Sequence, residues 1–288
     1  MPDVNRRSNA KPCPAVTRTF PPRPIAAPSW VIPGTVYENC RFLEGKVDEA
    51  ALLFFDAEAC LAYTRQDLPV ELAALDLSYH VHLPLSPSWE KGGAFVAEMC
   101  LRLMEKVDFL GAARAVVHPP GSEYPDAGAP LLESFAARWQ NAGRSPADVF
   151  IENTRENDLA VLLENERLIA AGVGLCLDLG HMLAYGQKAL AQYVFKKMAQ
   201  PGAGGPRVGM VHCNAPGSGE GGEKKSAHLP LDRLDNEGAT LGKALCAVLD
   251  PEGIIVAEFF SWEYVARSLP VIREWDAGRE PGFACGGC

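Results

Sequence analysis

The sequence contains no apolar run that approaches the length of a membrane span, and its first residues lack the apolar core of a signal peptide. A bilayer-crossing helix needs about 20 mostly apolar residues, so a membrane-spanning protein is excluded. No Gly/Ser-rich or charged linker interrupts the middle of the chain, and two short Gly-rich stretches, residues 200–206 and 217–225, are typical of loops. We therefore expect one soluble, cytoplasmic domain without a membrane partner.

Basic residues are scarce relative to acidic ones. The chain has 27 Lys and Arg against 36 Asp and Glu, a net charge of −9. Residues 1–23 are rich in Pro and Arg, show no periodicity and are expected to form a disordered leader. This leader carries +4, which leaves −13 on the rest of the chain. Because nucleic-acid affinity depends largely on Lys and Arg neutralising phosphates, we expect no nucleic-acid partner.

The nine cysteines show no disulfide framework. Without a secretion signal, this pattern indicates a reducing compartment and mostly buried thiols, such as Cys176 and Cys213 within predicted strands. The tail, residues 279–288, ends in the string CGGC. A lone CxxC lacks the second pair of ligands that a structural zinc needs, so a featureless tail and an accessory redox or metal role both stay open.

Short β-branched runs alternate with stretches of helical periodicity from residue 24 onward. Apolar residues recur at helical spacing over residues 93–110 and 159–171, for example, and predict helices there. Eight strands alternating with helices predict an α/β fold, a single-domain (β/α)8 TIM barrel over residues 24–278. The predicted strands cover residues 25–30, 51–55, 79–83, 113–118, 149–153, 174–179, 208–213 and 254–259.

Side chains of the metal-binding type recur at or just beyond the ends of these runs, in YHVHLP, VVHPPG, VFIENT, CLDLGH, MVHCN, SAHLPL and VAEFF. Imidazole and carboxylate suit borderline divalent cations, and active sites of such barrels lie at the carboxyl ends of the strands. His80 shares a strand face with His82 but lies farther from the strand end, so we expect it in the core or behind the ligands. The predicted ligands are His82, His118, Glu152, Asp178, His181, His212, His228 and Glu258.

Four longer strings resemble a known family: SWVIPGTVYENCRFLEGKVDEAALLFFD, YHVHLPL, LCLDLGHMLAYG and HLPLDRL. Over residues 26–275 the chain resembles the xylose isomerase-like TIM barrels, in the branch of endonuclease IV (apurinic-site endonuclease family 2), and is most similar to the cobamide remodeling phosphodiesterases. The first string is the most specific, because it contains no predicted metal ligand. The resemblance implies hydrolysis of the nucleotide loop of a small-molecule corrinoid, with a cobinamide-type product.

The resemblance also implies a role for each ligand. The family pattern has an Asp two residues before His228, where this chain has Ser226. We therefore expect two zinc or manganese ions and regard a third site as weaker. Glu152 would bridge the two ions, and Glu152, Asp178 and Glu258 are the expected catalytic residues. His82 and His118 would hold one ion, Asp178, His212 and Glu258 the other, and His181 and His228 the third.

Four further residues are candidates for substrate binding. Arg155, in IENTRE, either contacts a phosphate through its paired donors or is a solvated residue at a helix start. Trp89, Tyr185 and Trp262 are expected near the mouth of the barrel. There they would either line a pocket for a bulky ring or pack the loops.

Two other functions stay open, and no oligomeric state is predicted. Keto-sugar epimerases on this barrel use a single-metal quartet, which here would be Glu152, Asp178, His212 and Glu258. Such an enzyme would have no need of the four additional histidines at positions 82, 118, 181 and 228. A noncatalytic corrinoid- or sugar-binding barrel that keeps these residues for structure is the third possibility.

Overall fold

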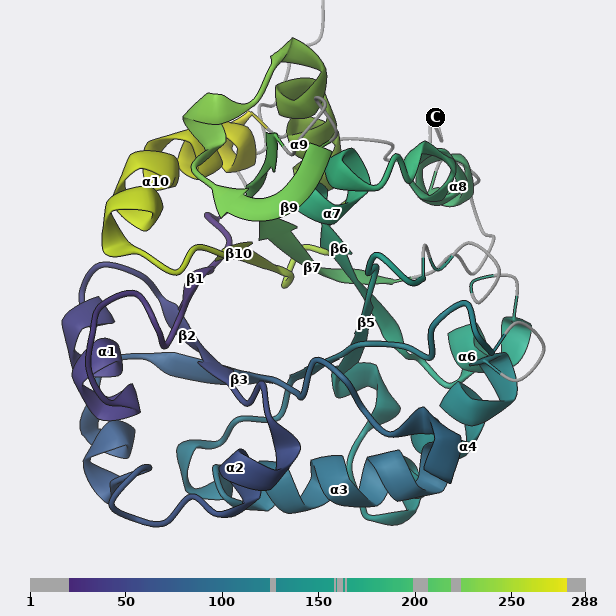
Figure 1. Ribbon diagram of the computed structural model, residues 1–288. Coiled ribbons are helices and arrows are strands. Elements are labelled where there is room, and N and C mark those ends of the chain that lie inside the picture. Colours follow the sequence, from purple (N-terminus) through teal and green to yellow (C-terminus); the bar gives the residue numbers. More distant parts are fainter. Residues whose placement is uncertain are drawn as a thin grey trace, which may run out of the picture.

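The computed structural model describes residues 21–124, 128–157, 159, 163, 165–198, 207–218 and 224–278. Eight parallel strands form a closed barrel, and helices surround it (Figure 1). The order around the barrel is β1-β2-β3-β4-β5-β6-β7-β10, so strands that follow one another along the chain are neighbours in the sheet, and β10 closes on β1. The predicted single-domain (β/α)8 TIM barrel is confirmed.

The observed strands coincide with the eight predicted ones, and their ends agree within two residues. The apolar runs identify each strand, whereas the last hydrogen-bonded residue depends on the register with the neighbouring strand. The strand β2 is shifted most, because it begins at Glu49 and not at residue 51. The bounds are β1 Ile25–Pro28, β2 Glu49–Leu53, β3 Ser78–His82, β4 Ala115–Val117, β5 Val149–Glu152, β6 Gly174–Asp178, β7 Val208–Cys213 and β10 Ile254–Ala257.

Alternate strand residues belong to two separate apolar clusters. The larger cluster packs the outer face of the barrel against the helices. The smaller one fills the barrel interior and consists of Ala26, Val116, Phe150, Cys176, Met210, Ile254 and Val256. Because side chains alternate along a strand, Glu152, Asp178 and His212 point to the same side as Phe150, Cys176 and Met210. The interior cluster therefore forms the floor beneath these three polar side chains.

Helices cover the outside of the barrel, and in the described part of the chain none is both long and apolar enough to cross a bilayer. The start of α7 has a direct bearing on the site, because α7 follows β6 without a loop. Its N-cap is Asp178, whose Oδ1 accepts a hydrogen bond from the backbone N–H of His181 at 2.5 Å. The helices are α1 Val36–Leu43, α2 Ala57–Leu61, α3 Gly93–Glu105, α4 Gly128–Asn141, α6 Glu166–Ala170, α7 Leu179–Ala184, α8 Lys188–Met198, α9 Asn236–Val248 and α10 Trp262–Ala277.

The helix expected over residues 93–110 is shorter than predicted. It ends at Glu105, and a separate 3-10 turn, Asp108–Leu110, follows it. The buried Val107 between the two continues the apolar periodicity, which explains the overextended prediction. In the second stretch, 159–171, α6 covers Glu166–Ala170, and the side chain of Asn165 caps its first turn by accepting a hydrogen bond from the N–H of Arg167. Leu163 is helical as well, and residues 160–162 and 164 lie outside the described residues.

The Gly-rich stretch 217–225, predicted as a loop, is partly strand. Its two ends belong to an antiparallel pair, β8 Ala215–Ser218 and β9 Lys224–Leu229, which packs against α7 (Figure 1). This hairpin places His228 above the barrel from outside the eight-stranded sheet. Residues 219–223, the predicted loop 200–206, residues 1–20 of the leader and the tail 279–288 lie outside the described residues.

The prediction of mostly buried thiols is confirmed for the six cysteines that the structure describes. All are buried free thiols: Cys40, Cys60, Cys100, Cys176, Cys213 and Cys246. Burial raises the pKa of Cys40 and of Cys176 to about 12, so both are protonated at neutral pH. Such thiols are poor nucleophiles, and their contribution here is to packing.

Arg23, assigned to the leader from the sequence, is a buried part of the barrel. It is 6% exposed, and its Nη1 lies 3.3 Å from Oδ1 of Asp276 on α10. Its guanidinium also donates to three backbone carbonyls, that of Cys246 in the last turn of α9 and those of Leu249 and Asp250 just after this helix. The sequence did not reveal that Arg23 is buried, because a single Arg in a segment rich in Pro and Arg gives no periodic signal. The expected leader is therefore too long at this end.

We predict that Arg23→Ala lowers the free energy of unfolding by about 3 to 5 kcal/mol, because it removes one partner of a buried ion pair and leaves the backbone carbonyls without their donors. Urea denaturation measures this change. The exposed pair Lys243–Glu274 supplies the control, and Lys243→Ala should cost less than about 1 kcal/mol. Equal stabilities of the two variants would contradict the anchoring role of Arg23.

Candidate metal centre

Six of the eight predicted ligands lie at the carboxyl ends of six strands, β3 to β7 and β10. These strands are consecutive around the barrel (Figure 1). The remaining two strands, β1 and β2, contribute none of the predicted ligands. Side chains at one end of a closed barrel point toward a common centre. The six residues are His82, His118, Glu152, Asp178, His212 and Glu258.

Glu152 lies at the middle of this group. Its side chain is 1% exposed, and imidazoles face both of its oxygens. The Oε2 atom lies 3.0 Å from Nε2 of His82 and 3.2 Å from Nε2 of His118. The Oε1 atom lies 3.4 Å from Nδ1 of His212 and 3.7 Å from Nδ1 of His181. Each carboxylate oxygen therefore faces its own pair of imidazoles.

His212 connects Glu152 to the other two carboxylates. Its Nδ1 lies 3.2 Å from Oε1 of Glu258 and 4.0 Å from Oδ2 of Asp178. The Oε2 atom of Glu258 faces His228, whose Nδ1 is 3.5 Å away. His212 is 1% exposed, and neither of its ring nitrogens has a hydrogen-bond partner among the described residues. A buried imidazole whose two nitrogens both lack a hydrogen-bond partner needs a proton or a cation between it and the carboxylates.

Backbone carbonyls orient the imidazoles of His82 and His118. Nδ1 of His82 lies 3.0 Å from the carbonyl oxygen of Leu83, and Nδ1 of His118 lies 2.9 Å from that of Leu85. These contacts place the ring proton on Nδ1, so the lone pair on each Nε2 faces Glu152. Metal-binding histidines are commonly held in this way, with one nitrogen donating to the protein and the other available as a ligand.

The spacing of these atoms fits a divalent cation. With metal–ligand bonds of about 2.1 Å, neighbouring ligands around one ion lie roughly 3.0 to 3.4 Å apart. The distances from Glu152 and Glu258 to the nearest imidazole nitrogens are 3.0 to 3.5 Å. Two overlapping groups have ligand atoms within 4.8 Å of one another: His82, Glu152, His212 and Glu258, and Glu152, Asp178 and His181. Their residues can hold a metal ion.

The buried charges change the proton affinities of the group. Burial is the main reason why the pKa of Asp178 is raised, to about 7. Burial opposes the charge on His181, but the carboxylates of Asp178 and Glu152 outweigh it and raise its pKa to about 9. For Glu152 and Glu258 burial also opposes the charge, yet His212 and a second histidine outweigh it and hold both pKa values below their usual range. The site is thus poised to exchange protons for a cation.

Asn214 is a site residue that the sequence analysis missed. It is fully buried, and its Nδ2 donates to Oδ2 of Asp178 at 2.9 Å and to Oε2 of Glu258 at 3.2 Å. This amide holds two like-charged carboxylates at fixed positions. Its place depends on Gly180, because a Cβ there would lie only 1.7 Å from Oδ1 of Asn214. The available signal was the string MVHCN, in which Asn214 follows His212 by two residues and so shares its side of the strand.

The two ligands of the weaker third site lie at the edge of the cluster. His181 is in the first turn of α7, and His228 is on β9, so neither ends a barrel strand. Their ring centroids are 6.3 Å apart. His228 has a φ of 44°, a left-handed conformation that is strained for a residue other than glycine. Ser226 Oγ lies 3.5 Å from Nε2 of His228 and supplies no charge.

The four predicted substrate contacts have different outcomes. Tyr185 borders the site, with its ring centroid 5.6 Å from that of His181. Arg155 is exposed on the loop after β5. Trp262 packs edge-on against Phe42 on the outer side, so it packs helices α1 and α10 together.

Trp89 is predicted at the mouth but is only 4% exposed, within the apolar core. Its Nε1 donates to the carbonyl oxygen of His118 at 3.2 Å. The ring therefore supports the backbone of a predicted ligand and offers no surface to a substrate. Sequence alone placed Trp89 beyond a strand end but could not reveal that the chain there turns back into the core.

Two aromatic residues next to the site were not predicted. Phe55 follows β2, and its ring lies 5.9 Å from that of His82. Phe260 follows β10, and its ring lies 4.8 Å from that of His228 and 6.0 Å from that of Phe55. Both belong to strings noted above for other reasons: Phe55 lies near the end of the longest resembling string, and Phe260 is the final residue of VAEFF.

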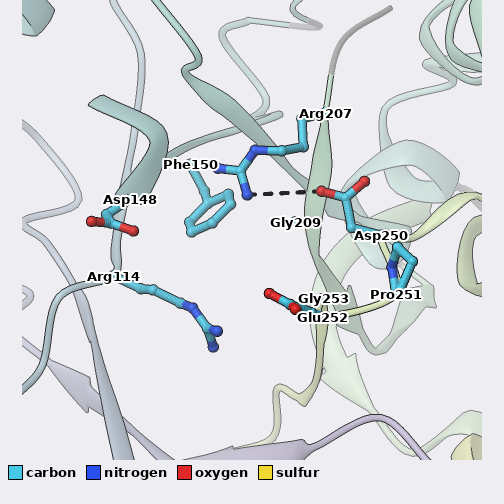
Figure 2. Close-up of a pocket in the computed structure, with 9 residues that line it drawn as sticks. All are labelled: Arg114, Asp148, Phe150, Arg207, Gly209, Asp250, Pro251, Glu252 and Gly253. Atoms are coloured by element: carbon cyan, nitrogen blue, oxygen red, sulfur yellow. Dashed lines mark ion pairs between the residues drawn. The ribbon is translucent and has the colours of Figure 1, made fainter. Parts of the chain in front are cut away.

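A separate cavity of about 430 Å³ lies at the opposite end of the barrel (Figure 2). Its lining residues precede strands β4, β5, β7 and β10 or are the second residue of β5 and of β7, so it opens at the amino ends of these strands. Arg207 pairs with Asp250 at 3.8 Å, and Asp148 and Glu252 add further acidic groups near Arg114 (Figure 2). This end of such barrels contributes to stability, and the cavity is remote from the predicted metal ligands.

His80 also lies toward this end, as predicted for a core residue. It is fully buried, and its Nδ1 lies 2.6 Å from Oε1 of Glu49 on β2. The side chain of Glu49 also accepts a hydrogen bond from Ser78 and lies 3.7 Å from Nη1 of Arg114. His80 is thus held by a buried carboxylate of its own and is not among the residues around Glu152.

The chain matches no protein-family model and no curated protein. Among solved structures it is similar to a xylose isomerase domain protein from Planctomyces limnophilus, with 14% identity and a TM-score of 0.59 over 91% of this chain and 99% of that one. It is also similar to a xylose isomerase-like TIM barrel protein from Mycobacterium smegmatis, solved in complex with magnesium. There the identity is 12% and the TM-score 0.55, over 90% of this chain and 99% of that one.

A third similar structure is a sugar phosphate isomerase/epimerase from Parabacteroides distasonis, with 11% identity and a TM-score of 0.57 over 92% of this chain and 97% of that one. At these identities the likeness concerns the fold and not the reaction. The structural neighbours of this chain are xylose isomerase-like TIM barrels, as the sequence resemblance implies.

Proposed function

We propose that the protein is a metal-dependent phosphodiesterase with two divalent cations, zinc or manganese, at the carboxyl end of the barrel. One observation carries the proposal: Oε2 of Glu152 faces Nε2 of His82 and of His118, whereas its Oε1 faces Nδ1 of His212. A carboxylate with one ion on each oxygen bridges a two-ion site.

The remaining donors would divide between the two ions. His82 and His118 would hold one ion with Oε2 of Glu152, and His212 would hold the other with Asp178 and Glu258, whose oxygens lie 4.0 and 3.2 Å from its Nδ1. When bound, such a pair of cations lowers the pKa of a water molecule and stabilises the attacking and leaving oxygens of an in-line displacement at phosphorus. His181 and His228 are the donors of a weaker third site.

Asp178 is the residue best placed to orient the nucleophilic water. Its two oxygens are held by different donors, the backbone N–H of His181 and the side-chain amide of Asn214. A carboxylate fixed at both oxygens keeps its orientation when a water binds, which reduces the cost of alignment in the transition state. The Asn214 amide fixes Glu258 in the same way.

We further propose that the substrate is a cobamide and that the protein hydrolyses its nucleotide loop to a cobinamide-type product. The four resembling strings support this choice, and so does charge, because the acidic chain is poorly suited to a polyanionic nucleic acid. Phe55 and Phe260 beside the predicted ligands suit a substrate that carries a large apolar ring.

A sugar isomerase or epimerase is the second candidate. The quartet Glu152, Asp178, His212 and Glu258 is present and close together, and one structural neighbour is a sugar phosphate isomerase/epimerase. Paired carboxylates around one ion can move a proton next to a carbonyl. Against it stands His118, whose Nε2 lies 3.2 Å from Oε2 of Glu152 but which is not among the residues grouped around a single possible ion, whereas His82 fits either arrangement.

Glu152→Gln should reduce turnover by more than about 100-fold, since loss of residues that merely support metal ligands already costs 10- to 100-fold. Elemental analysis of the purified variant should show a loss of bound metal from about two ions per chain. The control is Glu156→Gln, which makes the same change at an exposed position four residues later. Retention of two ions and of near-parental activity in Glu152→Gln would exclude it as the bridge.

Metal binding should release protons, and release more of them at pH 6 than at pH 8. In the metal-free protein, the raised pKa values of Asp178, about 7, and of His181, about 9, mean that both are protonated at pH 6, whereas Asp178 has lost its proton by pH 8. Affinity for zinc or manganese therefore increases with pH over this range. Titration calorimetry in buffers of different ionisation enthalpy measures the release, and a value independent of pH would argue against a role for Asp178 as a ligand.

The substrate is tested by incubating metal-loaded protein separately with an adenosylated cobamide, an abasic-site DNA duplex and a panel of keto-sugars. We expect only the cobamide to react, with a cobinamide-type product on chromatography that disappears on chelation and returns with metal. Epimerisation of a keto-sugar without cobamide hydrolysis would favour the second candidate. Cleavage of the DNA at physiological salt would instead indicate an endonuclease.

A further inference from the structure

Two buried amide side chains, Asn153 and Gln187, form a network next to the predicted metal ligands. Asn153 directly follows Glu152 at the end of β5, and Gln187 lies between α7 and α8. Oε1 of Gln187 accepts a hydrogen bond from Nδ2 of Asn153 at 2.9 Å, and its Nε2 donates to the carbonyl oxygen of Thr154 at 2.6 Å. We call Asn153 and Gln187 the amide pair. The amide pair ties the end of β5 to the segment that follows α7.

The side chain of Asn153 extends the pairing of β5 with the neighbouring strand β6 (Figure 1). The register of the two strands ends with Glu152 opposite Cys176. Beyond this point the carboxamide of Asn153 binds both backbone groups of Asp178. Its Oδ1 accepts from the N–H at 2.7 Å, and its Nδ2 donates to the carbonyl oxygen at 3.2 Å. Since buried backbone groups need partners, this side chain does the work of a further strand residue and fixes Asp178 relative to Glu152.

The backbone of Asn153 orients another predicted ligand. Nδ1 of His181 lies 2.9 Å from the carbonyl oxygen of Asn153, which places the ring proton on Nδ1 and leaves Nε2 available as a ligand. The imidazoles of His82 and His118 are oriented instead by carbonyls that follow β3. The amide pair therefore supports one side of the group of predicted ligands and not the other.

Gln187 keeps the carboxamide of Asn153 in this orientation. A terminal amide has a broad torsional preference, so its hydrogen bonds decide how it is turned. The two N–H groups on Nδ2 of Asn153 have different acceptors, the carbonyl of Asp178 and Oε1 of Gln187. Gln187 is itself anchored, because its backbone N–H donates to the carbonyl of Met182 in α7 at 3.0 Å. Among the described residues no hydrogen bond or ion pair joins Gln187 to a predicted ligand, so its influence on them passes through the end of β5.

We propose that Gln187 is a positioning residue, which acts through Asn153 to fix Asp178 at the metal centre. Functional side chains must be held within about 0.5 Å of their productive positions, and the supporting hydrogen bonds supply that precision. Without Gln187, the ion that Asp178 would hold should bind more weakly, whereas the ion at His82 and His118 should keep its affinity. The inference rests on the two-ion arrangement proposed above, but its test needs no reaction.

The test replaces Gln187 with Met, which is of similar length and removes both side-chain hydrogen bonds. The full chain, freed of metal by a chelator, is titrated with zinc against a competing chelator of known affinity. The parent should show two sites. In Gln187→Met one site should be at least about tenfold weaker, as is typical when a residue that supports metal ligands is lost, and the other should be unchanged. Gln192→Met is the matched control, since Gln192 is exposed on α8, and it should bind zinc as the parent does.

A double-mutant cycle separates positioning from a general loss of stability. Asn153→Ala alone should weaken the same zinc site, and adding Gln187→Met to it should cause little further loss, because the second residue acts through the first. A purely structural role would weaken both sites together, and independent effects of the two substitutions would add. Unchanged zinc binding in Gln187→Met, equal weakening of both sites, or additive effects would each overturn the proposal.

The zinc measurement also separates the amide pair from the proposed reaction. If Gln187→Met weakens one of two sites but the zinc-loaded parent cleaves no phosphodiester, the amide pair is supported and the reaction is wrong. If the parent cleaves cobamide and Gln187→Met binds zinc as the parent does, the reaction stands and the amide pair is overturned. A parent with a single zinc site would contradict the two-ion reaction, and weaker binding there in Gln187→Met would still support the amide pair, because the one-ion quartet also contains Asp178. A parent that binds no zinc would overturn both.

Discussion

The site depends on one buried carboxylate. Glu152 is almost completely shielded from water and faces four imidazoles, two at each oxygen. A charge in this position is tolerated only with compensating cations or protons, since an isolated buried carboxylate would cost many kcal/mol. The surrounding arrangement serves that requirement: carbonyls orient His82 and His118, and Asn214 separates the other two carboxylates.

The barrel supplies the positions. Six neighbouring strands end with one donor each, and the alternation of side chains along β5, β6 and β7 stacks the donors on an apolar floor. The remaining pair of strands ends in apolar residues instead. One closed sheet thus carries two different surfaces at the same end, and the division follows the order of the strands rather than a separate domain or lid.

Much of this could be predicted from the sequence. Strand positions followed from apolar runs, and strand-end His, Glu and Asp marked the side chains that the closed barrel brings together, because both signals are local. The misplaced residues depend on distant partners. Arg23 is buried by carbonyls and a carboxylate near the other end of the chain, Trp89 turns inward to the carbonyl of His118, and Phe260 meets Phe55 and His228 only after the barrel has closed. Local patterns carry no information on such contacts.

The close approach of Gly180 to Asn214 has a consequence for evolution. A methyl group at position 180 would overlap the amide oxygen of Asn214, so the two positions cannot vary independently although they are far apart in the chain. A lineage that gains a side chain at 180 must first replace Asn214 with something smaller, and then loses the donor shared by Asp178 and Glu258. Among related sequences, glycine at the first position and asparagine at the second should therefore be inherited together, as a paired signature of barrels that keep both carboxylates in this arrangement.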